Sequence, residues 1–116
     1  MIAFAIWLIC SASFAPDAHT QVVGETGTVK RTTPGCPSSE HLANLLLTFE
    51  FIGEEQATDK FHRYNCVVLH EGETVTIAGH QRQLDRVCVR RLNDSDCYWM
   101  LFDDFKSRPQ LRNPVR

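Results

Sequence analysis

Histidines and carboxylates are the side chains of this sequence best suited to proton transfer or metal binding. Imidazole titrates near neutral pH, which suits it to acid–base catalysis and to metal ligation. Only His70 has two carboxylates close by, at Glu71 and Glu73, and a solvated turn explains that cluster better than a site does. The pairs Glu54-Glu55 and Asp103-Asp104 are sequence neighbours, which point apart on a helix or strand. We assign no catalytic residue, metal ligand or cofactor.

Five cysteines are the next candidates for chemistry, and Cys10 lies in an apolar leader. Without Cys10 four cysteines remain. An even number of cysteines in a short mature chain indicates disulfides formed in an oxidising compartment. Three pairings are possible, and we favour the one in which each pair brackets a local unit. A zinc site is disfavoured because the sequence has no CxxC and its spacings are irregular. The favoured pairs are Cys36–Cys66 and Cys88–Cys97.

Arginines gather near the end of the chain, beside two aromatic residues. On a strand Arg86 and Arg90 share one face, while Arg91 lies on the other. Such a group can form a positive patch for acidic polymers or lipid headgroups, although pairing with Asp94, Asp96 and the acidic helices is the simpler explanation. A tryptophan in this stretch either faces a core or stands exposed as a ligand platform. The predicted contact residues are Arg86, Arg90, Arg91, Tyr98 and Trp99.

Length, charge and the first residues define the compartment and the broad class. The 116 residues suffice for one domain, and a net charge of −2 gives no basic field for nucleic acid. Residues 1–15 are apolar and end in small residues, as in a secretory signal peptide. This run is too short for a stable membrane span, which needs about 20 apolar residues. We expect a secreted or periplasmic protein with no membrane span after cleavage.

The elements that must position these residues begin with two helices. Residues 16–35 have few apolar side chains and are predicted to be a disordered linker. Ser38 is a good N-cap, and Gly53 is a natural helix stop. A second helix follows from Glu54 to about Tyr64, which gives a helical hairpin over 38–64. Its first helix has an apolar face formed by Leu42, Leu45, Leu46, Phe49 and Ile52.

Short strands are predicted after the hairpin. Residues 66–69 and 74–77 form two of them, and residues 78–83 form a loop. The stretch 86–105 is predicted to contain two strands joined by a polar turn at 93–96, because Asn, Asp and Ser favour turns. The segment 106–116 carries prolines and positive charge and is predicted to be a disordered basic tail.

The strand segments resemble a bacterial SH3-like barrel. The residues that carry this resemblance are the glycine turn and strand 72–77, the strand 87–90, and Tyr98-Trp99. The stretch from Gly35 to Phe105 is also similar to small exported proteobacterial proteins of uncharacterised function. The resemblance implies an α+β fold with two disulfides, formed by residues 36–105. An N-terminal helical hairpin would pack on a small SH3-like antiparallel β-barrel over 66–105.

These features predict non-catalytic binding to an envelope protein or cell-wall polymer, because SH3-like barrels host many functions and no motif here indicates a reaction. One alternative is a secreted effector or hydrolase-like enzyme that uses His70 or His80. Another is a structural or inhibitory partner of an envelope enzyme, with the acidic helices as the contact. The sequence does not define the oligomeric state.

Overall fold

The structure is a computed structural model that describes residues 23–107. The predicted signal peptide at 1–15 and residues 108–116 of the predicted tail lie outside the described residues. Two helices and seven strands occur within the described range. In chain order they are β1 (Thr26–Val29), β2 (Thr33–Gly35), α1 (Ser39–Phe51), α2 (Glu54–Arg63), β3 (Val67–Leu69), β4 (Thr74–Gln81), β5 (Arg86–Arg91), β6 (Cys97–Leu101) and β7 (Phe105–Ser107).

Five of the strands form an antiparallel sheet in the order β6-β5-β4-β1-β7. The alternation expected for residues 74–77 is present, since Val75 and Ile77 are each 1 % exposed. In β5, Val87 and Val89 are fully buried. Burying such side chains supplies the main favourable free energy of a small domain. The core cluster consists of Val29, Leu69, Val75, Ile77, Val87, Val89, Met100 and Phe105.

The two helices follow the local signals in the sequence. Ser38 caps α1, accepting a hydrogen bond from the His41 amide at 3.3 Å. Gly53 separates the helices with a φ of 145°, which a residue with a side chain rarely adopts. The predicted apolar face of α1 is only partly covered: Leu45 is 4 % exposed, whereas Phe49 is 58 % exposed.

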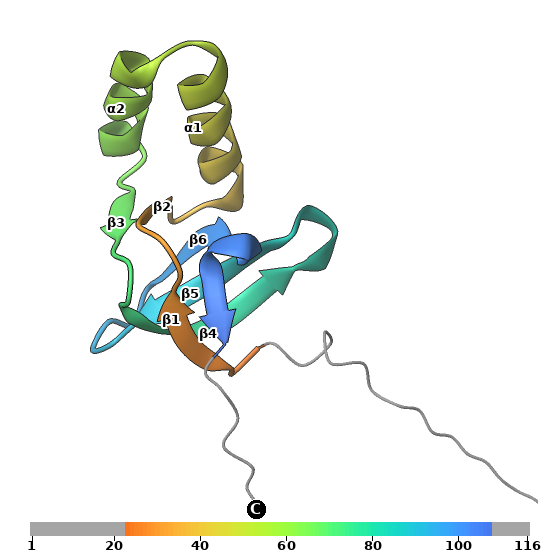
Figure 1. Cartoon of the computed structure of the whole chain (residues 1–116). Helices are drawn as coiled ribbons and strands as arrows, with labels where there is room; N and C mark the ends of the chain where they lie inside the picture. Colours follow the sequence, from red (N-terminus) through yellow and green to blue (C-terminus); the bar gives the residue numbers. More distant parts are fainter. Residues whose placement is uncertain (1–22, 108–116) are drawn as a thin grey trace, which may run out of the picture.

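The helical hairpin is inserted between β2 and β3, which pair with each other as a separate two-stranded sheet. Figure 1 shows the hairpin standing away from the larger sheet, with β2 and β3 at its foot. The ladder between these strands ends at Gly35↔Val67, and the Cys36–Cys66 disulfide follows immediately. The second disulfide joins Cys88 to Cys97, so both bonds connect the cysteines favoured from the sequence.

The predicted N-terminal position of the hairpin, and with it the expected fold class, is wrong. Two strands precede the helices, and seven strands form a five-stranded and a two-stranded sheet. The described part of the predicted linker 16–35 contains β1 and β2. The predicted tail begins too early, since β7 includes Lys106 and Ser107. Residues 78–81 also continue β4 beyond a register shift, instead of forming a loop.

β1 was not predicted from the sequence, because this strand forms by pairing with strands that are distant in the sequence. Its threonines and Val29 favour a strand, but Val29 is the only large apolar residue, so the alternating apolar pattern of a half-buried strand is missing. Its hydrogen bonds go to β4 on one side and to β7 on the other. A Cβ atom at Gly27 would lie 2.2 Å from the Lys106 carbonyl oxygen, so glycine is needed for the close approach of β7.

We predict that the two disulfides contribute unequally to stability. Removal of Cys36–Cys66 by a double alanine substitution should lower the free energy of unfolding by about 3–4 kcal/mol, and removal of Cys88–Cys97 by about 2–3 kcal/mol. The difference arises because the first bond closes a separation of 30 residues and the second one of 9. Denaturant unfolding of the two variants measures both values. A larger loss for the Cys88–Cys97 variant would contradict the prediction.

Candidate functional site

The three predicted contact arginines do not form one patch. Arg86 donates to the Ser39 hydroxyl at 2.9 Å and to its carbonyl oxygen at 3.2 Å, which ties β5 to the start of α1. Arg91 donates to a Glu73 carboxylate oxygen at 2.6 Å. Arg90 is exposed. Two of the three guanidinium groups therefore hold elements of the fold together.

The two predicted contact aromatics are half-buried. Trp99 packs against the cluster at the foot of the hairpin, with Cys36, Leu42 and Cys66 among its members. Its backbone also exchanges two hydrogen bonds with Cys36. Burial, together with the nearby Asp94 and Asp96 charges, raises the pKa of Tyr98. Trp99 is therefore a packing residue of the junction between hairpin and sheet.

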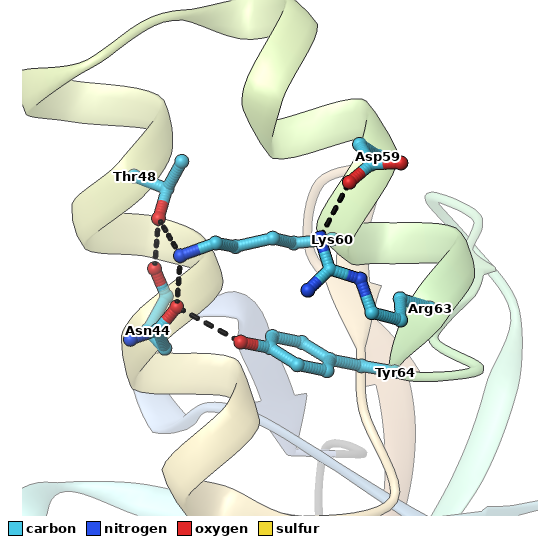
Figure 2. Close-up of polar contacts among 6 residues, drawn as sticks. All are labelled: Asn44, Thr48, Asp59, Lys60, Arg63 and Tyr64. Carbon is cyan, nitrogen blue, oxygen red and sulfur yellow. Dashed lines mark hydrogen bonds and ion pairs between the residues drawn. The ribbon is translucent and has the colours of Figure 1, made fainter.

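The contact between the two helices has a polar side. The Lys60 ammonium of α2 donates to Asn44 at 2.7 Å and to Thr48 at 3.1 Å, both on α1. The Tyr64 hydroxyl donates to the same Asn44 oxygen at 3.0 Å (Figure 2). The Tyr64 ring also stacks on His41, with ring centroids 4.0 Å apart. These contacts join the two helices through polar side chains on this side of the hairpin.

The other side of the same helix pair is apolar and hollow. A groove of about 520 Å³ lies between α1 and α2 and reaches down to β2 and β3. Ala57, three threonines and two ionisable residues, Glu54 and His62, complete its lining. Large, mainly apolar concave surfaces with few polar groups are typical of binding sites. We call this feature the hairpin groove, and its apolar walls are Pro34, Leu45, Leu46, Phe49, Phe61 and Val68.

Other large apolar residues of α1 and its C-cap are exposed outside the groove. Leu47 is 55 % exposed, Phe51 73 % and Ile52 63 %, whereas a fully buried residue such as Leu42 is 1 % exposed. Leu47 and Phe51 are four residues apart and therefore neighbours on one face of α1, away from the face that lines the groove. The end of the hairpin where the two helices join carries exposed carboxylates, which we call the acidic tip: Glu50, Glu54 and Glu55.

The histidines proposed for catalysis lie apart from this groove. His70 is exposed in the turn before β4, where its backbone amide donates to Glu73. The ring of His80 lies 5.5 Å from that of Phe102, and its Nε2 atom is buried without a hydrogen-bond partner among the described residues. Residues 23–107 contain no group of three or more His, Cys, Asp or Glu placed to hold a metal ion. No helix in that range is long and apolar enough to cross a membrane.

Comparisons with protein families, with curated proteins and with solved structures found no match to this chain. The resemblance to exported proteobacterial proteins therefore stays a prediction.

Sequence reasoning missed the hairpin groove, although part of its signal was present. Leu46 and Phe49 belong to the apolar face of α1 predicted from the sequence, together with Leu42 and Leu45. That face is wider than one neighbouring helix can cover, because α2 offers few large apolar residues. An apolar helix face that is wider than the neighbouring helix can cover is the sequence signal by which this exposed surface could have been found.

The ion pair between Glu73 and Arg91 gives a pH-dependent contribution to stability. Partial burial raises the pKa of Glu73, but hydrogen bonds from Arg91 and from the His70 amide outweigh burial, so the net pKa lies below its usual value. A carboxyl group with a lowered folded-state pKa stabilises the fold above its unfolded pKa. This contribution is lost as the pH falls through the folded-state pKa.

We predict that Glu73→Gln lowers the free energy of unfolding by about 1 kcal/mol at neutral pH. The difference in unfolding free energy between the variant and the unmodified protein should vanish at about pH 2, where the carboxyl group is protonated in the folded and the unfolded state. Denaturant unfolding at several pH values measures it. Glu71→Gln is the matched control, since Glu71 has no ion pair among the described residues and should show no such difference. An equal loss at all pH values would contradict the electrostatic cause.

Proposed function

We propose that this protein is a non-catalytic binding module that acts outside the cytoplasm and takes an apolar segment of a partner protein into the hairpin groove. The observation that carries the proposal is the groove itself, with exposed apolar walls on a hairpin whose other side is polar. Grooves between helices commonly bind partner segments through spaced apolar anchors.

The position of the groove supports this role. Its walls come from β2, α1, α2 and β3, the four elements joined at the foot of the hairpin by the Cys36–Cys66 disulfide. On the opposite side, the contacts of Lys60 hold the two helices together. A preorganised groove binds with less loss of conformational entropy than a mobile one.

A protein partner fits this surface better than a cell-wall polymer. Polysaccharides are recognised largely through hydroxyl groups, and the groove offers few polar groups to pair with them. Two of the three arginines predicted for polymer contact are engaged elsewhere, Arg86 with Ser39 and Arg91 with Glu73. Apolar burial is instead the dominant favourable term in most protein–protein association.

The disulfides support a location outside the cytoplasm. Two such bonds are present in the described residues, and disulfides persist in oxidising compartments. Secretion or periplasmic placement is the specific form of this proposal, and it relies on the predicted leader at 1–15.

We predict that a photo-crosslinking amino acid at position 49 or 68 captures the same partner in cells that make the protein. The same group at position 84 should capture none, although Leu84 is 50 % exposed, because it lies in the turn after β4. Phe49→Asp should reduce the adduct formed from position 68 by at least about tenfold, since one central aromatic often dominates such an interface.

Crosslinking from the strand face, where the sequence predicted the binding site, would contradict the proposal. Adducts formed from the position of Arg90, and not from 49 or 68, would show that the partner binds the strand face. Circular dichroism of Phe49→Asp checks the fold, which should hold because Phe49 is 58 % exposed.

We predict that the protein isolated from its own cells has lost a leader and has no free thiols. Its intact mass should lack the first 12 to 18 residues, because cleavage is expected after Ala12, Ala15 or Ala18. Its four remaining cysteines should react with an alkylating reagent only after reduction. A full-length chain whose thiols are alkylated without reduction would overturn the compartment proposal.

A further inference from the structure

We infer that the segment bound in the hairpin groove combines apolar anchors with a lysine or arginine, and that this cation lies at the acidic tip. The inference rests on the proposed function and adds the chemistry and the orientation of the partner. It follows from the distribution of charge along the groove.

Negative charge lies at one end of the groove. Glu54 is the only carboxylate of its lining and stands at the first residue of α2. Glu50 and Glu55 flank it on the two helices, and both are exposed. None of the three has an ion pair among the described residues. A partner that brings a cation to this end would therefore meet carboxylates that are free to bind it.

The positively charged side chains of α2 lie at the foot of the hairpin and already have partners within it. The cations of α2 are in its last turn, at the foot of the hairpin. Lys60 donates to Asn44 and Thr48 on the polar side, and Arg63 pairs with Asp59 at 2.5 Å. His62 is the only titratable base among the groove lining residues. The described groove thus has no lysine or arginine to balance the acidic tip.

The ends of the helices do not cancel this asymmetry. α1 ends at the tip, where its unpaired carbonyl groups carry partial negative charge, and its last turn has no basic residue. The amino end of α2 carries partial positive charge there, but two full carboxylate charges in its first turn exceed it. The tip therefore has a net negative potential beside an apolar groove.

This combination favours a basic protein segment over an anionic membrane. The exposed Phe51 and Ile52 would suit insertion into a bilayer, but the same turn places three carboxylates against the headgroups. Anionic lipids attract clusters of lysine and arginine and repel such a surface. Complementary charge on a partner segment instead raises the rate of association and fixes its direction in the groove.

The test is selection of random 15-residue peptides displayed on phage against four immobilised forms of the full chain. These are the unmodified protein, a charge-reversed variant (Glu50→Lys/Glu54→Lys), a groove variant (Phe49→Asp) and a matched control (Leu84→Asp). Circular dichroism and thiol alkylation confirm that each is folded and disulfide-bonded. One enriched peptide is then synthesised, and its affinity is measured at low and high salt.

We expect the unmodified protein and Leu84→Asp to enrich the same apolar peptides that carry lysine or arginine. The charge-reversed variant should enrich apolar peptides that carry aspartate or glutamate. The synthetic peptide should bind that variant at least about tenfold more weakly, and high salt should narrow the difference because it screens exposed charges. Phe49→Asp should enrich neither class.

The contradictory outcomes separate this inference from the proposed function. Apolar peptides without charge preference, or the same peptides on the charge-reversed variant, would overturn the inference and leave groove binding standing. Equal enrichment on Phe49→Asp and on the unmodified protein would overturn both. Sedimentation of the protein alone, and flotation with phosphatidylglycerol vesicles, test other occupants. A dimer that Phe49→Asp abolishes would assign the groove to a second copy of the chain. Vesicle binding that Phe49→Asp abolishes would assign it to a membrane. Either result would overturn the inference.

Discussion

The junction at Cys36 joins the two parts of this fold. Its side chain forms the disulfide with Cys66 that closes the foot of the helical hairpin. Its backbone exchanges two hydrogen bonds with Trp99, at 3.0 and 2.6 Å, and so attaches β2 to the edge of the larger sheet. Cys36 is fully buried, and the cluster around it includes Leu42 and Ala57 from the two helices. Hydrogen bonds from Arg86 and between Ser39 and Gln81 add a second link between α1 and the larger sheet.

A hairpin held in this way can leave apolar surface exposed. An isolated pair of short helices in water would bury its apolar side chains by rearranging, since short helices are marginally stable on their own. Here the disulfide holds the foot, and the contacts of Lys60 and Tyr64 hold one side of the helix pair. The other side consequently keeps an open groove whose walls include Phe49 and Val68. The polar contacts and the groove are thus two sides of one packing arrangement.

The charges of the hairpin follow the same division. The cations of α2 are used within the hairpin, whereas the carboxylates of the acidic tip have no ion-pair partner among the described residues. Two arginines of the sheet are likewise engaged, Arg86 with α1 and Arg91 with Glu73, whereas Arg90 is exposed. Two of the three arginines predicted to bind a ligand are therefore structural. The carboxylates of the acidic tip lie at one end of the apolar groove, which is why the two features are best explained by one ligand.

Local signals in the sequence determined much of this protein. Ser38 caps α1 as expected, since capping depends on a side chain and an amide three residues apart. The alternation in 74–77 and the polar turn at 93–96 gave their strands correctly, because each pattern is complete within a few residues. The even cysteine count, with pairs bracketing local units, led to the disulfides that the structure contains.

Only the tertiary structure decided the rest. β1 forms because β4 and β7, far away in the chain, supply its hydrogen bonds, and TGTV alone has no alternating apolar pattern that would reveal a strand. The three arginines have similar local surroundings, yet Ser39 and Glu73 engage two of them from distant positions. Leu45 and Leu46 are adjacent and chemically identical, but only Leu45 is fully covered. Whether an apolar residue becomes core or binding surface depends on which other element covers it, and neighbouring residues in the sequence do not contain that information.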